Sequence, residues 1–188
     1  MIDPHVSLPV DHSVAPSLDV SLAVQGIVVS TSDERQRDGS ADAEPLPADL
    51  IERISAAVHD VFIGEGVQNA TSHVFFVAED RIAALNAEHL GGAGPTDVLS
   101  FPLDDPSEGD VFGFTPHAGD IVICPVIAQA QASQHAGTFE DEMVLLAVHA
   151  ALHLLGHDHH TDAERTAMQT LEARYLSRFG ITHPGDQL

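Results

Sequence analysis

The sequence predicts an α+β fold, in which helices pack on a small mixed β-sheet and one helix carries a metal site. The chain has 188 residues, of which 44% are hydrophobic, enough for one domain with its own core. Short strand-like segments and longer segments of helical periodicity follow one another irregularly, without the strict alternation of an α/β protein. Histidines recur at helical spacing near the end of an apolar segment, residues 143–159.

The N-terminal part is expected to supply the first strand and two irregular segments. In residues 19–25, apolar residues occupy alternate positions, the period of a half-buried strand. Residues 1–16 have no such pattern and are expected to form a flexible tail, which leaves a single domain over residues 17–188. Residues 31–45 are polar and charged without periodicity, so we expect a mobile insertion after this strand.

The rest of the chain is expected to mix helices and strands. From Pro47, apolar residues recur at helical spacing as far as Gly64, and the proline suits a first helical turn. The remaining elements are expected to be a strand at 73–78, a short helix at 80–89, a turn at 91–95, strands at 98–101 and 120–124, and helices at 128–135, 140–155 and 162–179.

Composition limits the environment and the partners. Cys124 is the only cysteine, which excludes an intrachain disulfide, and no segment has the pattern of a signal peptide or membrane span. We therefore expect a cytoplasmic protein with no membrane partner. The 29 acidic residues face 7 arginines and no lysine, which gives a net charge of −22 at pH 7. Such a surface repels nucleic acid and argues against tight binding driven by electrostatics alone.

The segment HAALHLLGHDH, residues 149–159, carries the candidate chemistry. His149 and His153 are spaced i and i+4, so on a helix they project from one face, close enough to bind one ion. Gly156 can end the helix in the left-handed conformation and return His159 to the same ion. Three protein ligands leave the fourth position of tetrahedral zinc open, as in catalytic sites. We expect one zinc ion per chain, bound by these three histidines.

These histidines have two other interpretations. The first is that they are structural residues with ordinary protein partners, but three imidazoles at this spacing around a glycine favour a metal. The second is a metzincin-like peptidase, because those enzymes share the HxxxHxxGxxH spacing. They place a glutamate directly after the first histidine as general base, and this chain has Ala150 there. A peptidase is therefore disfavoured.

The same segment resembles the HGxLHLxGYDH signature of the YbeY endoribonucleases, the bacterial rRNA maturation factors. Leu85-Asn86 is similar to the family's LN segment, residues 95–102 to its PTxVLSFP segment, and residues 119–124 to its GDIxI strand. The resemblance runs from about residue 19 to residue 176, in the expected order. It implies a protein that binds one zinc, cleaves single-stranded RNA and not DNA, matures the 3′ end of small-subunit rRNA and helps to remove defective ribosomes.

Three positions depart from the family pattern. Ala150 replaces a glycine and His157 a tyrosine, and neither change removes a ligand. Leu90 replaces an arginine that many members carry and that is suited to pair with phosphate oxygens. RNA binding would then rely on the metal, on backbone amides or on other arginines.

The resemblance also suggests residues that assist the metal. Ser100 and Asp120 occupy strand positions that face the family's cleft, so each is a candidate to contact the scissile phosphate or to position water. Asp158 is a candidate acceptor that orients a ligand imidazole. A purely structural role is the alternative for each.

Two functions of different class follow. The first is metal-dependent hydrolysis of phosphodiester bonds in single-stranded RNA, with either water or the RNA 2′-hydroxyl as nucleophile. Aromatic residues make up only 5% of the chain, which argues against extensive base stacking and hence against sequence specificity. The second is a ribosome-biogenesis adaptor with a mainly structural metal, whose acidic surface attracts the basic proteins of the small subunit.

Overall fold

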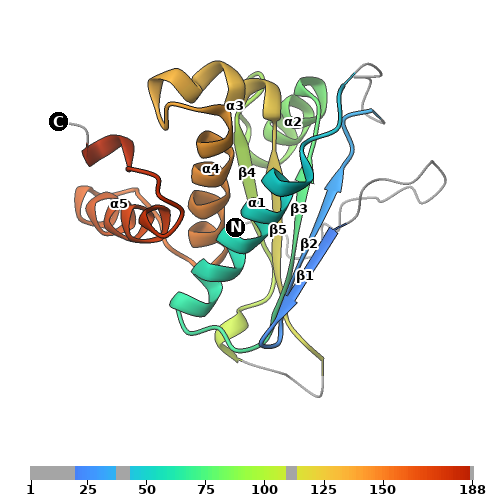
Figure 1. Ribbon diagram of the computed structural model, residues 1–188. Coiled ribbons are helices and arrows are strands. Elements are labelled where there is room, and N and C mark those ends of the chain that lie inside the picture. Colours follow the sequence, from blue (N-terminus) through green and yellow to red (C-terminus); the bar gives the residue numbers. More distant parts are fainter. Residues whose placement is uncertain (1–19, 37–42, 109–113, 187–188) are drawn as a thin grey trace.

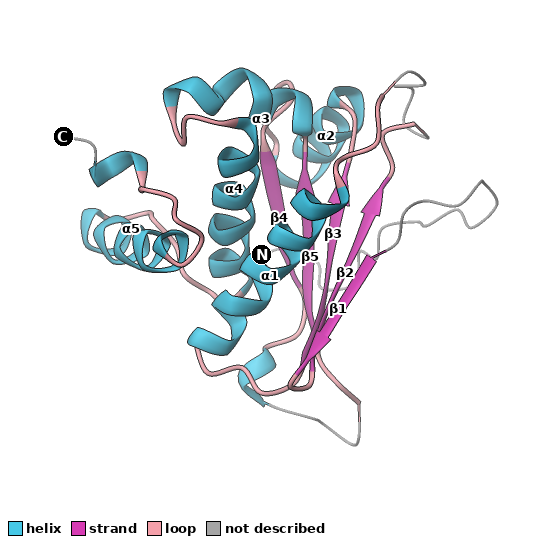
Figure 2. Ribbon diagram, in the orientation of Figure 1, coloured by secondary structure: helices cyan, strands magenta, loops and turns pink. Residues whose placement is uncertain are grey.

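The computed structural model describes residues 20–36, 43–108 and 114–186, and its centre is a twisted five-stranded sheet of order β1-β2-β3-β5-β4 (Figures 1 and 2). The central pairs β2–β3 and β3–β5 are parallel, whereas the outer pairs β1–β2 and β4–β5 are antiparallel. The mixed sheet predicted from the sequence is therefore confirmed. The strands are β1 Val20–Val24, β2 Ile27–Asp33, β3 Ala70–Phe76, β4 Val98–Pro102 and β5 His117–Ile123.

Helices cover both faces of the sheet unequally. On one face, α1 and α4 enclose the main core, to which the sheet contributes buried residues such as Val29, Val74 and Ile121. On the other face, α2 closes a smaller cluster around Phe75 and Val122. The helix α5 packs on α4 and α1 on the side away from the sheet (Figure 1). The helices are α1 Ala48–Gly64, α2 Glu79–Leu85, α3 Pro125–Gln131, α4 Phe139–Leu154 and α5 Asp162–Ser177.

Local sequence explains where the two helices that matter for the site begin. The side chain of Thr138 caps α4 by accepting a hydrogen bond from the Asp141 N–H. Acidic residues occupy the first turn, where their negative charge interacts favourably with the positive end of the helix dipole. Thr161 and Glu164 form a capping box at the start of α5. Most of α4 is apolar and buried because this helix lies between the sheet and α5.

The segment 31–45, expected to be a mobile insertion, has its first residues in the sheet. This segment begins inside β2, which pairs in parallel with β3 as far as Asp33, and Thr31 is fully buried. Arg35 is also buried, because its guanidinium binds both carboxylate oxygens of Asp33 at 2.8 and 2.6 Å and the Glu44 carbonyl at 2.7 Å. Paired polar groups therefore hold the first residues of the segment on the sheet.

Other boundaries differ by a few residues, and some expectations lie outside the described residues. β3 and β5 each begin three residues before the predicted strand, and the helix expected at 80–89 divides into α2 and a π-helical turn, Asn86–Leu90. The tail expected at residues 1–16 and residues 37–42 of the insertion are not among the described residues. In the described part of the chain, no helix combines the length and apolar character needed to cross a membrane.

Candidate metal centre

The three histidines of the HxxxHxxGxxH segment converge at the C-terminal end of α4. His149 and His153 lie in the last turns of α4, and Gly156, with φ of 85°, reverses the chain so that His159 returns to them. One nitrogen from each imidazole lies within 4.8 Å of the others. The Nε2 atoms of His149 and His153 are 3.2 Å apart, close to the roughly 3.3 Å expected for two nitrogens bound to a tetrahedral zinc at about 2.0–2.1 Å. This donor set fits a zinc ion.

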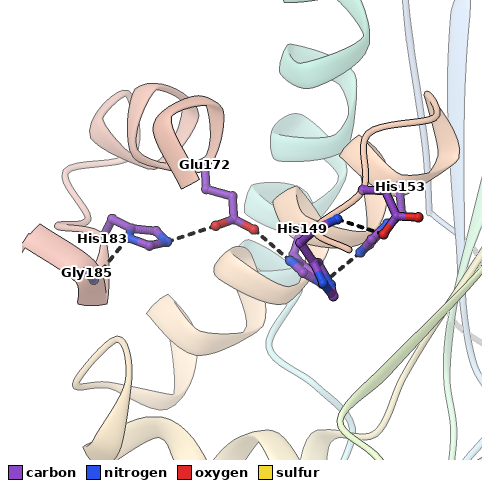
Figure 3. A network of polar contacts seen from close by, with 7 residues as sticks. His149, His153, Glu172, His183 and Gly185 are labelled. Carbon is purple, nitrogen blue, oxygen red and sulfur yellow. Dashed lines mark hydrogen bonds and ion pairs between the residues drawn. The ribbon is translucent and has the colours of Figure 1, made fainter. Parts of the chain in front are cut away.

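A carboxylate on α5 fixes the orientation of the first of these histidines. Nδ1 of His149 donates to Oε1 of Glu172 at 2.6 Å, which leaves the Nε2 lone pair for a metal (Figure 3). The other oxygen of Glu172 accepts from Nε2 of His183 at 2.9 Å, and Nδ1 of His183 accepts from the Gly185 N–H at 3.1 Å. Glu172 and His183 are 6% and 8% exposed, so a buried chain of hydrogen bonds supports the ligand.

The electrostatics of the site favour the charge states that metal binding needs. Burial raises the pKa of Glu172, but hydrogen bonds and charge from His149 and then His183 outweigh burial and hold this pKa below its usual range. Burial lowers the pKa of His153, and the neighbouring His149 and His159 lower it further. Glu172 is therefore an anion and His153 a neutral imidazole at neutral pH, the form that binds a metal.

Metal occupancy is expected to fall as the pH drops below about 6.5, the ordinary pKa of histidine, because protons and metal compete for the same nitrogens. Burial lowers the pKa of His153, so this ligand remains unprotonated at a lower pH than an exposed histidine does. Release of the metal should therefore be complete only at a pH below the lowered pKa of His153. Dialysis at a series of pH values, followed by elemental analysis, measures this release. A site that remains full at pH 4 would mean that carboxylates carry the coordination.

The two strand residues that could act together with the metal, Ser100 and Asp120, lie on opposite faces of the sheet. Ser100 pairs with Ile121, so it lies on the sheet face that α4 covers, and a role for it remains a proposal. Asp120 pairs with Phe101 and lies on the opposite face, where its Oδ1 binds Nε2 of His117 at 2.9 Å. Strand alternation therefore points Asp120 away from the helix that carries the histidines.

Asp158 does not orient a ligand ring among the described contacts. Its Oδ1 accepts from the backbone N–H of His159 at 2.7 Å, and its Oδ2 lies 2.7 Å from Nε2 of His160. That backbone hydrogen bond is the main reason why the pKa of Asp158 lies below its usual value. Asp158 thus shapes the ligand-bearing turn, and Glu172 is the carboxylate that orients a ligand.

Two departures from the family pattern take different positions. Leu90 is 59% exposed at the end of the π-helical turn, so it is not a core residue. His157 donates from Nε2 to Glu65 at 3.1 Å, and the same carboxylate accepts from the Tyr175 hydroxyl at 2.6 Å. Burial, and then the hydrogen bond to Glu65 and its charge, raise the pKa of Tyr175 to about 12. This network ties the turn between His153 and His159 to α1 and α5.

Reasoning from the sequence missed Glu172 and His183, although Glu172 carried a signal. Met168, Glu172, Tyr175 and Leu176 follow helical spacing and are the buried residues of α5. A glutamate on the apolar face of a helix needs a partner, because burial of an unpaired charge is costly. No comparable signal marks His183, which lies beyond α5 in irregular chain.

The chain is similar to known proteins over most of its length. The family model for endoribonuclease YbeY matches residues 36–180. The endoribonuclease YbeY of Geobacillus thermodenitrificans (strain NG80-2) is 37% identical over 152 residues, which cover 78% of this chain and 97% of that protein. The one of Rhodopseudomonas palustris (strain HaA2) is 37% identical over 180 residues, which cover 94% of this chain and 85% of that protein.

A solved structure is also similar in sequence. The solution structure of a Thermotoga maritima protein is 31% identical and covers 72% of this chain and 84% of that chain, with a TM-score of 0.49. The family match and the two relatives together span most of the chain, from β2 through α5, including the three histidines and Glu172. The chain belongs to the endoribonuclease YbeY family.

Proposed function

We propose that this protein is a metal-dependent endoribonuclease that hydrolyses phosphodiester bonds in single-stranded RNA. The observation that carries the proposal is the convergence of His149, His153 and His159 in a member of the YbeY family, with Glu172 holding the first of them in the tautomer that binds a metal. Zinc is the metal proposed, because three imidazole nitrogens with an open fourth position are typical of catalytic zinc.

The residues of the chain have distinct tasks in this proposal. A bound zinc ion would polarise a phosphoryl oxygen and stabilise the charge that develops in the transition state. The three imidazoles hold the ion, and Glu172 keeps His149 from rotating away. His149 and His153 are half-buried and His159 is exposed, so a flexible single strand can reach the site more readily than a stiff duplex.

The cellular role proposed is maturation of the 3′ end of small-subunit rRNA and quality control of ribosomes in the cytoplasm. The family relationship supports this role. The net charge of −22 does too, because an acidic protein is steered toward the basic proteins of the small subunit. The same charge makes strong binding to naked RNA unexpected.

The test is a cleavage assay with the zinc-loaded protein on one RNA, presented as a single strand and as a duplex. We expect cleavage of the single strand, little cleavage of the duplex, and none by a His149→Ala variant. A strand with one 2′-deoxyribose at the cleavage position distinguishes attack by water from attack by the 2′-hydroxyl. If the loaded wild-type protein leaves RNA intact but binds basic ribosomal proteins, the adaptor function with a structural metal replaces the nuclease.

A further inference from the structure

A cavity of about 350 Å³ adjoins the metal centre between α4, α5 and the segment around His183. His149 and His159 form part of its wall, and Leu145, Met168 and Pro184 supply apolar surface. Cavities of about 300–1,000 Å³ with apolar walls and a few convergent polar groups are typical of ligand sites. Apart from the histidines of the metal centre, Glu172 and His183, the polar side chains that line the cavity are His135, Arg165 and Gln169.

Arg165 places a positive charge at the edge of this cavity. Its Nη2 donates to the backbone carbonyl of His159, the third proposed metal ligand, at 3.4 Å. Its carboxylate partner is Asp162, whose side chain is fully exposed and 3.6 Å away. Such an exposed pair is weak, so the guanidinium can exchange this partner for a phosphate.

The other arginines of the described segments do not line this cavity. Three of them pair with carboxylates, at distances of 2.6–3.3 Å: Arg35 with Asp33, Arg53 with Asp141, and Arg178 with Asp60. Arg174 lies over the ring of Tyr175. The fifth, Arg81, belongs to α2, which packs on the other face of the sheet. Arg165 is thus the arginine of the described segments that lines this cavity.

His135, which lines the cavity, has one ring nitrogen fixed by a buried carboxylate. Its Nδ1 donates to Oε1 of Glu142 at 2.9 Å, and the Ala136 N–H donates to Oε2 of the same carboxylate at 3.2 Å. The Glu142 side chain is fully buried, whereas that of His135 is 43% exposed. With Nδ1 turned to Glu142, the neutral ring has a free acceptor at Nε2, for which the described residues provide no partner.

We propose that this cavity holds one ribonucleotide of the substrate beside the metal centre. Arg165 pairs with the phosphate of this nucleotide, and Nε2 of His135 accepts a hydrogen bond from its 2′-hydroxyl. The 2′-hydroxyl is a hydrogen-bond donor that DNA lacks, so an oriented acceptor in this place selects RNA over DNA. The buried Glu142 carboxylate has the task of fixing the tautomer and orientation of His135. This subsite rests on the proposed nuclease function and adds the means by which the chain selects its substrate.

Binding of an eight-nucleotide oligouridylate and of the oligodeoxyuridylate of equal length to the zinc-loaded protein tests the subsite. Fluorescence anisotropy is measured on ice at several salt concentrations, directly after mixing and before the RNA is cleaved, and a gel identifies samples in which cleavage has occurred. The variants are Arg165→Gln and His135→Ala. Their matched controls are Arg174→Gln, nine residues along α5 and so on its opposite side, and Gln134→Ala, the exposed neighbour of His135.

Arg165→Gln should weaken binding of both oligonucleotides and reduce the slope of log affinity against log salt by roughly 0.7, the value for one phosphate contact in a single strand. Arg174→Gln should leave this slope unchanged. His135→Ala should weaken RNA binding about fivefold without affecting the DNA oligonucleotide, because it removes one hydrogen bond to the 2′-hydroxyl. Gln134→Ala should change neither. Zinc content and melting are measured for each variant.

The subsite is refuted if Arg165→Gln behaves like Arg174→Gln, or if His135→Ala weakens RNA and DNA equally. If the unpaired carboxylate of Glu142 unfolds His135→Ala, the double variant H135A/E142Q removes that charge and is measured instead. A wild-type protein that binds zinc but does not cleave RNA contradicts the nuclease function itself. Cleavage by the wild type together with control-like variants contradicts only the subsite.

Discussion

Replacing His153 with alanine is expected to reduce the metal content from one ion per chain to nearly none and RNA cleavage by about a thousandfold or more. The reason is that His153 is one of two ligands from α4, and its Nε2 lies 3.2 Å from that of His149, so two imidazoles without it cannot enclose an ion. A catalytic metal supplies several kcal/mol of transition-state stabilisation, and each 1.36 kcal/mol is a factor of about ten in rate. Elemental analysis and single-turnover cleavage measure the two effects.

His160→Ala is the matched control for this change. His160 is the neighbour of a proposed ligand, but its side chain is 81% exposed and it is outside the converging group. Its replacement should leave metal content and cleavage close to those of the wild type. Full metal content in His153→Ala would show that the ion binds elsewhere, and equal losses in both variants would point to a general effect of histidine removal.

Glu172→Gln is expected to weaken zinc binding by about 10- to 100-fold while the protein stays folded. The amide retains the shape of the carboxylate but loses its charge, so the 2.6 Å contact with Nδ1 of His149 no longer strengthens the metal-binding nitrogen. Glutamine has one acceptor oxygen where glutamate has two. If that oxygen faces His149, the amide NH2 faces the N–H of His183 and the hydrogen bond to His183 is lost. Competition with a chromogenic chelator measures the zinc affinity.

Glu140→Gln makes the same change of charge at an exposed position in the first turn of α4. If both variants lose affinity equally, the effect of Glu172 is long-range electrostatics and not orientation of His149. His183→Ala should produce a smaller loss than Glu172→Gln, because His183 acts on the ligand only through Glu172. Unchanged affinity in Glu172→Gln would mean that His149 is oriented without this carboxylate.

The parts of the fold with strong periodicity were predictable, and β2 was not. The helices α1, α4 and α5 and the strand β4 lie close to their predicted ranges, because long apolar patterns and capping residues specify them locally. β2 has only a short apolar run, and its later residues are polar yet buried by pairing with β3. Gln25 and Gly26, with φ of 52° and 83°, form the turn before it. This two-residue turn is the sequence signal that could have revealed the hairpin.

The candidate site shows the same division. The three histidines lie within eleven residues, so helical geometry and one glycine suffice to bring them together. The orientation of Asp120 depends on strand alternation and register in the complete sheet, which short motifs do not specify. His183 reaches Glu172 only through the path of the chain after α5, and local sequence does not encode that path.

The position of α5 on α4, away from the sheet, has a consequence for how a metal bound by the three histidines would exchange. Glu172 lies on α5 and His183 in the segment that follows it, so both residues of the chain of hydrogen bonds behind His149 belong to this outer layer. Binding of the ion and docking of α5 must therefore reinforce one another by the same free energy. Local opening of α5 frees the His149 ring to rotate and gives the ion a route out that spares the core. In the metal-loaded protein, the amide protons of α5 should exchange with solvent deuterium more slowly than in the metal-free protein, while those of the central strands change little.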